Sequence, residues 1–228
     1  ARSIVSTFLI NAVMWSVPRA FAACRLIPAC RDTSLTTSMA RLQQHRCVHT
    51  ADPGALRAYI AREALRVTTS CITEVPGVDA IVNCANEFLV GPKLPYVNVD
   101  GSGGCIYNSV DVSIHKKAGP RLHAACMQFD VVEEGGPDAS WGGIRCPVGQ
   151  ARITDAFDLP HCRYVVHVVG PQWPDDTEVL RDTYRSCITA ALDYNCQAIK
   201  SMAVPAISAG VQQWPRDMSW AAAVEVVA

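Results

Sequence analysis

Three short apolar runs place the tightest constraint on how this chain can fold. They cover residues 78–84, 162–169 and 201–207, and each is followed by a turn rich in asparagine, glycine, proline or serine. Their length and their content of β-branched residues are typical of strands buried on both faces of a sheet. Residues 177–195 repeat an apolar side chain at every fourth position, as an amphipathic helix does. Alternating strands and helices predict an α/β domain, with three α/β/α layers around a mixed, largely parallel central sheet.

Local signals predict the remaining elements. A short strand is expected at 65–69. Pro53 and Pro120 stand where a helix begins, because proline at the first helical position has no amide hydrogen to leave unpaired. A last helix is expected from about Asp217, and the residues at 91–108, rich in Gly, Pro and Asn, are expected to form a long loop.

Composition excludes a disordered or fibrous chain, since 50% of the 228 residues are hydrophobic and only 18% are charged. The net charge of −1 gives no basic field that would attract nucleic acid. Residues 1–50 carry six arginines and one acid, whereas the rest of the chain carries 14 basic and 20 acidic residues. Any affinity of the main domain for an anion must therefore come from local geometry.

The first 50 residues have the composition of a targeting segment. The apolar run 4–17 is too short to span a bilayer, which needs about 20 residues. A secretory signal would use Ala20-Phe21-Ala22 for cleavage, but the arginines continue to residue 46, which favours a mitochondrial presequence. A non-physiological extension, which would leave a cytoplasmic or nuclear protein, is the third alternative. We therefore expect residues 1–50 to lie outside the fold and 51–228 to form the domain.

The eleven cysteines do not indicate a disulfide framework, because their number is odd and no two form a C-x-x-C pair. We expect reduced thiols that are mostly buried, as small hydrophobic groups are. The histidines and cysteine within 45–49 have no partner pair at zinc-finger spacing, so no metal site is expected.

Two loops are candidates for a binding site. Ligands of open α/β sheets bind at the carboxyl ends of strands, and here these ends precede the loops after Asn83 and Ile207. The segment Ser208–Val211 could wrap a phosphate with backbone N–H groups, with Gly210 in a left-handed conformation. An ordinary strand-to-helix turn has the same appearance, so this signal is weak by itself.

The chain resembles the macrodomain family, specifically its MacroD-type ADP-ribose hydrolases. The resemblance is carried by several motifs in order, among them VDAIVNCAN, YVVHVVGP and PAISAGV. The matching stretches are residues 78–86, 110–120, 147–160, 164–171 and 205–215. The resemblance implies a macro fold and a hydrolase that removes mono-ADP-ribose from acidic side chains or deacetylates O-acetyl-ADP-ribose. Its partners would be ADP-ribose, O-acetyl-ADP-ribose or ADP-ribosylated proteins. We expect a monomer that needs no cofactor, metal, nucleic acid or membrane.

The same resemblance implies two catalytic residues. Asn86 would hold the distal ribose through an amide that both donates and accepts hydrogen bonds, and Asp111 would orient or deprotonate the attacking water. The structural alternatives are a turn-capping amide for Asn86 and a helix N-cap for Asp111. His115 and His167 are expected to be structural. The implied ligand-binding residues are Cys71, Ile72, Val110, Ser208, Ala209, Gly210, Val211, Gln212 and Trp214.

Four departures from the family pattern bear on function. Cys71 stands where the family has the acidic residue that recognises adenine. The glycines before the Val-Asp pair are replaced by Asn108-Ser109 after an insertion, so that Asp100 offers a rival register to Asp111. Gln212-Gln213 replace an aromatic residue and a glycine.

The fourth departure lies at Ala228, where the sequence given ends inside a helix, whereas the family continues with another strand and helix. That strand belongs inside the family's sheet, so we expect unpaired backbone groups there. These departures leave two alternatives to the hydrolase: an ADP-ribose-binding module without turnover, and an inactive relic.

Overall fold

The structure is a computed structural model. It describes residues 12–16 as backbone, together with 65–68, 70–92, 109–135, 141–196 and 198–227. The helix expected from Pro53, the histidines and cysteine at 45–49, most of the loop 91–108 and Asp100 lie outside these residues. Within the described residues, no helix has the length and apolar character needed to cross a membrane.

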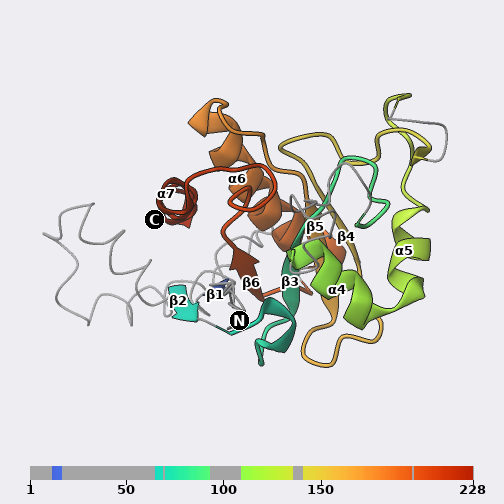
Figure 1. Cartoon of the computed structure of the whole chain (residues 1–228). Coiled ribbons are helices and arrows are strands. Elements are labelled where there is room, and N and C mark those ends of the chain that lie inside the picture. The colour runs from blue at the N-terminus through green and yellow to red at the C-terminus, as the bar shows by residue number, and fades with distance from the viewer. Residues whose placement is uncertain are drawn as a thin grey trace, which may run out of the picture.

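Six strands form one mixed sheet in the order β2-β1-β6-β3-β5-β4 (Figure 1). The three inner strands β6, β3 and β5 are parallel, whereas β1 and β4 pair antiparallel with their neighbours. The sheet confirms the predicted α/β class. The strands are β1 (Ala12–Ser16), β2 (Leu65–Thr68), β3 (Ala80–Cys84), β4 (Ala151–Asp155), β5 (Tyr164–Val168) and β6 (Ser201–Pro205).

Helices cover both faces of the sheet. Figure 1 shows the green helices α4 and α5 on one side and the orange and red helices α6 and α7 on the other. Side chains cap two of these helices, because Ser109 accepts a hydrogen bond at the start of α4 and Asp176 at the start of α6. The helical elements are η1 (Ile72–Glu74), α4 (Val110–Ala118), α5 (Pro120–Cys126), α6 (Thr177–Asp193), η3 (Tyr194–Cys196) and α7 (Arg216–Val227).

Alternation along the inner strands creates two hydrophobic cores. Ile81 and Val165 face α4 and α5, whereas Val82 and Val166 face α6 and α7. Successive side chains of a strand point to opposite faces, so a run that is apolar at every position is buried on both. The predicted strands at 78–84, 162–169 and 201–207 are therefore confirmed, with ends a few residues shorter than expected.

The N-terminal strand corrects an expectation from the sequence. β1 lies within residues 1–50, which we expected outside the fold, yet it pairs antiparallel with both β2 and β6. The unpaired backbone groups that we expected inside the sheet are not found beside β6, because β1 pairs with it. A pairing with the far end of the chain leaves no local signal, because the apolar run 4–17 satisfies a targeting segment equally well.

Two further elements differ from the sequence-based expectation. β4 was not predicted, because Arg152 and Thr154 break the apolar run in a strand at the sheet edge. In α6 the buried stripe includes Cys187 and Ala191, whereas Ile188 lies only half-buried, so its spacing follows three and four residues rather than four alone. The six cysteines whose side chains the structure describes are all free thiols, as expected: Cys71, Cys84, Cys126, Cys146, Cys162 and Cys187.

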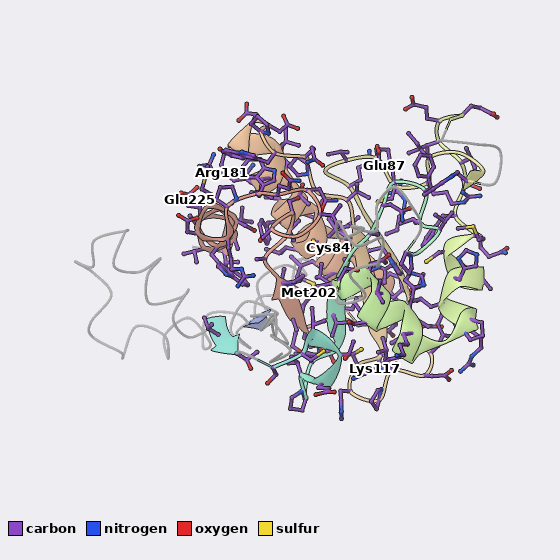
Figure 2. All side chains as sticks on the ribbon, in the orientation of Figure 1. Cys84, Glu87, Lys117, Arg181, Met202 and Glu225 are labelled. Carbon is purple, nitrogen blue, oxygen red and sulfur yellow. The ribbon has the colours of Figure 1, made fainter. Side chains whose placement is uncertain are left out.

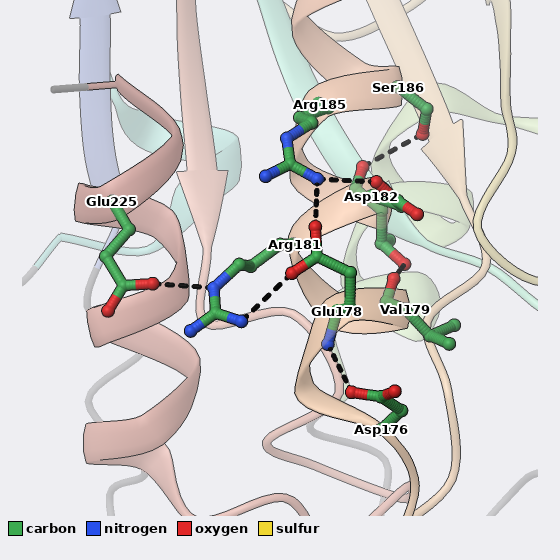
Figure 3. A network of polar contacts seen from close by, with 9 residues as sticks. Asp176, Glu178, Val179, Arg181, Asp182, Arg185, Ser186 and Glu225 are labelled. Carbon is green, nitrogen blue, oxygen red and sulfur yellow. Dashed lines mark hydrogen bonds and ion pairs between the residues drawn. The ribbon is translucent and has the colours of Figure 1, made fainter.

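Polar contacts hold α6 to α7 and both helices to the end of β6. On the surface, Arg181 Nε donates to Glu225 Oε2 at 2.6 Å (Figure 3). In the interior, the Tyr184 hydroxyl accepts from the Ile207 N–H at 2.9 Å, and Ser219 Oγ donates to the Ile207 carbonyl at 2.7 Å. The hydroxyls of Tyr184 and Ser219 are themselves 2.7 Å apart. These buried bonds fix the backbone immediately before the loop that begins at Ser208.

We predict that Tyr184→Phe destabilises the fold by about 1–3 kcal/mol, because it leaves the buried Ile207 N–H without its acceptor. Urea denaturation measures the free energy of unfolding. The control is Tyr164→Phe, since the Tyr164 hydroxyl has no hydrogen-bond partner in the described part of the chain. Equal losses in the two variants would contradict the assigned role of the Tyr184 hydroxyl.

Candidate functional site

Parallel pairing brings two loops to one edge of the sheet. β3 runs parallel to β6 and to β5, so the loops after Cys84 and Pro205 leave from the same side. The two loops come close at Ser208, whose backbone favours the charged form of the Cys84 thiol, although burial raises the pKa of that thiol to about 12. A Cβ on Gly170, which follows β5, would collide with the Ser208 hydroxyl, so only glycine fits there. The predicted meeting of the two loops is confirmed.

The loop after β3 is closed by the side chain of Asn86, which is 5% exposed. Its Nδ2 donates to the Gly91 carbonyl at 2.7 Å, and its Oδ1 accepts from the Val90 N–H at 3.3 Å. Gly91 has φ +75°, and a Cβ there would lie 3.1 Å from the His115 ring. Asn86 is thus a turn-closing amide in this structure. One N–H and one lone pair of the amide remain for another partner.

Asp111 is a buried carboxylate at the start of α4, with 8% of its surface exposed. It is not the N-cap, because Ser109 occupies that position. Asn83 Nδ2 donates to Asp111 Oδ1 at 2.8 Å, and His115 Nε2 lies 3.4 Å from the same oxygen. Burial raises the pKa of Asp111 to about 7, against the opposing effect of the Asn83 hydrogen bond. A carboxyl group with this pKa can accept a proton near neutral pH.

His115 contributes no positive charge at this site near neutral pH. Burial, assisted by the nearby charge of His123, lowers the pKa of His115 to about 4. The imidazole is therefore neutral and packs between Gly91 and Asp111. It connects the loop of Asn86 to the carboxylate of Asp111, so both predicted catalytic residues belong to one group of contacts.

The loop after β6 presents three consecutive backbone amides. The N–H groups of Gly210, Val211 and Gln212 have no hydrogen-bond partner among the described residues. Of the predicted amides, that of Ala209 is already bonded to the Ala206 carbonyl at 3.3 Å, and that of Ser208 lies close to the Cys84 thiol and favours its charged form.

The left-handed residues of this loop are Ser208 (φ +63°) and Gln213 (φ +64°). The prediction that Gly210 adopts this conformation was therefore wrong. Nothing lies within 4 Å of a Cβ built on Gly210, so this face of the loop is open.

Two tryptophans stand beside these amides. Trp214 is 2% exposed, and its ring meets that of Trp173 edge-on, with 4.9 Å between the ring centroids. The backbone N–H of Trp173 donates to the Gln212 carbonyl at 2.8 Å. Ser208 Oγ and Trp214 Nε1 are buried without a hydrogen-bond partner in the described part of the chain. A polar ligand at this loop would find both donors and acceptors.

The structure does not bring Cys71 and Ile72 into this group. Cys71 Sγ lies 3.2 Å from Thr73 Oγ1 in its own turn, and Ile72 is fully buried in the core beneath α4. The last residue of η1, Glu74, pairs with Lys117 at the far end of α4. In Figure 2, Lys117 lies at the bottom of the view, whereas Glu87 from the loop after β3 lies near the top. Val110 is half-buried, packed against the same core as Ile72.

Sequence reasoning did not assign four residues to this region, because it expected His115 and His167 to be structural only and gave Asn83 and Trp173 no role. Asn83 and His167 are register partners on adjacent strands, a relation that the alternation of the two strands could have indicated. His115 follows Asp111 by four residues and therefore shares its helix face. Trp173 gave no signal, because its partner Trp214 is distant in sequence. Among the described residues, no group of histidine, cysteine and carboxylate side chains is arranged to hold a metal ion.

The raised pKa of Asp111 predicts a pH-dependent penalty on stability. A carboxyl group with a folded pKa of about 7, against 3.8 when exposed, stabilises the fold most at low pH, and this contribution is lost as the pH rises through 7. Asp111→Asn removes the charge and keeps an acceptor for Asn83. Its free energy of unfolding, relative to that of the parent, should therefore increase by about 2–3 kcal/mol between pH 5 and pH 8.

Urea denaturation at both pH values gives this difference. Asp130→Asn is the control, because Asp130 is exposed and has no described partner. If the difference in free energy of unfolding between parent and Asp111→Asn stays constant with pH, the pKa of Asp111 is not raised in the folded protein.

Comparisons with known proteins show what this chain is similar to. The chain is 42% identical over 141 residues to a macro domain-containing protein of Vibrio parahaemolyticus, across 60% of this chain and 66% of that protein. It is 38% identical over 154 residues to an O-acetyl-ADP-ribose deacetylase of Enterobacter cloacae, across 66% of this chain and 69% of that protein. The chain thus spans about two thirds of the length of these relatives.

Solved structures give the same result. The macrodomain of Oceanobacillus iheyensis with ADP superposes with a TM-score of 0.53 at 28% identity, across 71% of this chain and 72% of that one. The macrodomain of Trypanosoma brucei in complex with ADP-ribose gives a TM-score of 0.51 at 28% identity, across 69% and 53% of the two chains. The sequence profile of the Macro domain family matches residues 82–223. The chain therefore belongs to the Macro domain family.

Proposed function

We propose that this protein binds ADP-ribose and hydrolyses esters of its distal ribose, such as O-acetyl-ADP-ribose or mono-ADP-ribosylated carboxylates. The observation that carries the proposal is the buried Asp111 carboxylate, held at the edge of the sheet where the two strand-end loops meet. A relative named as an O-acetyl-ADP-ribose deacetylase and neighbours solved with ADP or ADP-ribose support the choice of ligand.

The loop after β6 would bind the diphosphate. The N–H groups of Gly210, Val211 and Gln212 have no partner among the described residues and would donate to the phosphate oxygens, as successive backbone amides do in anion sites. None of the described hydrogen bonds of this loop involves a lysine or arginine side chain. Neutral amides bind an anion at lower desolvation cost than a buried cation would, which suits a domain with an acidic balance.

Asp111 would act as a general base. Its carboxylate accepts a proton from a water molecule, and the resulting hydroxide attacks the ester carbonyl carbon. The tetrahedral intermediate then collapses, the bond from that carbon to the ribose oxygen breaks, and the ribose oxygen takes up a proton. The products are ADP-ribose and a carboxylic acid. The neutral His115 beside Asp111 does not compete for the proton near pH 7, because its pKa is about 4.

Asn86 would hold the ribose with the one N–H and one lone pair that its loop leaves free. The use of the same amide to close the loop is the observation that favours the alternative function, an ADP-ribose-binding module without turnover. Binding and turnover are therefore tested separately.

We predict that Asp111→Ala lowers kcat/KM for O-acetyl-ADP-ribose by about 10²–10⁴-fold, the usual contribution of a general base. The dissociation constant for ADP-ribose should change little, because the base acts on water and not on the diphosphate. Product release measures the rate, calorimetry measures the affinity, and Asp130→Ala is the control. A parent protein that binds without turnover supports the module, and one that does not bind refutes the proposal.

We predict that Gly210→Val weakens ADP-ribose binding by about 10–100-fold without unfolding the protein. The Cβ added to Gly210 has no protein atom within 4 Å, and the valine side chain would cover amides that would bind phosphate. Calorimetry measures the affinity and urea denaturation the stability. Ala221→Val adds similar bulk on the exposed face of α7 and should leave binding unchanged. Unaltered affinity in Gly210→Val would remove this loop from the site.

A further inference from the structure

A row of buried polar side chains crosses the sheet beneath α4. Asn83 lies on β3, His167 on β5 and Thr154 on β4, and their exposures are 0%, 0% and 6%. Asn83 and His167 are direct register partners. Both share the sheet face of Ile81 and Val165, which is the face that α4 covers. Three polar groups in an otherwise apolar layer are costly unless they are mutually bonded.

The hydrogen bonds of the row run in one direction. Asn83 Nδ2 donates one hydrogen to Asp111 Oδ1 at 2.8 Å and lies 3.2 Å from His167 Nδ1. An amide nitrogen only donates, so Nδ1 accepts, and the neutral ring carries its hydrogen on Nε2. Nε2 then donates to Thr154 Oγ1 at 3.0 Å. When Asp111 is ionised, the reversed amide would set its oxygen against the carboxylate, which repels it.

We propose that His167 is a positioning residue that acts through Asn83 on Asp111. The Nδ1 lone pair holds the second N–H of the Asn83 amide, and this fixes the first N–H on the carboxylate. Thr154 favours this tautomer by accepting from Nε2 at the shorter distance, while Cys126 Sγ lies 3.7 Å from the same nitrogen. Without His167, the amide of Asn83 would have one anchor only, because its Oδ1 has no partner among the described residues. The proposal rests on the proposed function only in so far as Asp111 serves there as the base.

None of the titratable groups that face Asp111 changes its protonation state in the pH range where Asp111 titrates. His115 on the same helix and His167 across the sheet have pKa values lowered by burial to about 4 and about 3. Burial raises the pKa of the thiols of Cys84 on β3 and Cys126 on α5 to about 12. Among these groups only Asp111, with a pKa of about 7, titrates near neutrality. A change in its titration therefore reports on the Asn83 hydrogen bond.

The test follows the Asp111 carboxyl carbon by NMR as a function of pH in the protein without ligand. His167→Leu removes the acceptor in a similar volume and should raise the pKa of Asp111 by about one pH unit, because the carboxylate loses a hydrogen bond. His167→Asn keeps an acceptor where Nδ1 was and should restore the pKa toward that of the parent. Thr154→Val should raise the pKa by a smaller amount, because the ring loses the partner that fixes its tautomer.

Thr183→Val is the matched control. Thr183 is a buried threonine on α6, bonded to the Val179 carbonyl on the opposite face of the sheet, and its loss should leave the pKa of Asp111 unchanged. An unchanged pKa in folded His167→Leu overturns the proposal. If that variant does not fold, an unchanged pKa in Thr154→Val overturns it. The NMR titration needs no substrate. If the parent protein shows no turnover, the proposed hydrolase activity is refuted, but the titration still decides the role of His167.

Where turnover is present, the acidic limb of the pH–rate profile should move with the pKa, to higher pH in His167→Leu and back in His167→Asn. A variant could instead lose activity at every pH while the acidic limb of its profile and the pKa of Asp111 stay unchanged. Such a variant would show structural damage only, and this result would refute the positioning role.

Discussion

Parallel pairing of β3 with its two neighbours, β5 and β6, is the constraint on which the rest of the structure depends. It requires that the chain leave all three strands at the same edge, so the loops that follow them must meet. The close approach of Gly170 to Ser208 and the contact of Ser208 with Cys84 are direct consequences. The hydrogen bonds of Tyr184 and Ser219 to the Ile207 backbone then fix the position at which the loop with the free amides begins.

Burial of Asp111 connects this architecture to chemistry. The same packing that covers α4 raises the pKa of the carboxyl group to about 7, a value suited to a base near neutral pH. Burial alone would raise the pKa but would not orient the carboxyl group. The hydrogen bond from Asn83 favours the charged form and fixes the position of one carboxylate oxygen. Stability and reactivity therefore depend on the same side chains, a common cost of functional sites.

Much of the fold could be predicted from the sequence, because the inner strands are apolar on both faces and need no partner to be recognised. The loops after β3 and β6 could likewise be placed together from strand direction alone. The pairing of β1 with β6 could not, since nothing near residues 12–16 indicates a partner so far along the chain. At the site, Asp111 was expected and the amides of Gly210 and Val211 are free as predicted, but the amide of Ala209 is bonded within the turn and that of Gln212 is free instead, because turn geometry decides which N–H groups are already bonded.

The most direct test of the account is an NMR titration of backbone amides with ADP-ribose. One site at the carboxyl edge of the sheet predicts shifts in both loops together, at residues 86–91 and at Gly210, Val211 and Gln212, with the start of α4 following at the same ligand concentration. Shifts confined to one loop, shifts elsewhere on the domain, or none at millimolar ligand would contradict the claim that these segments form a single binding site.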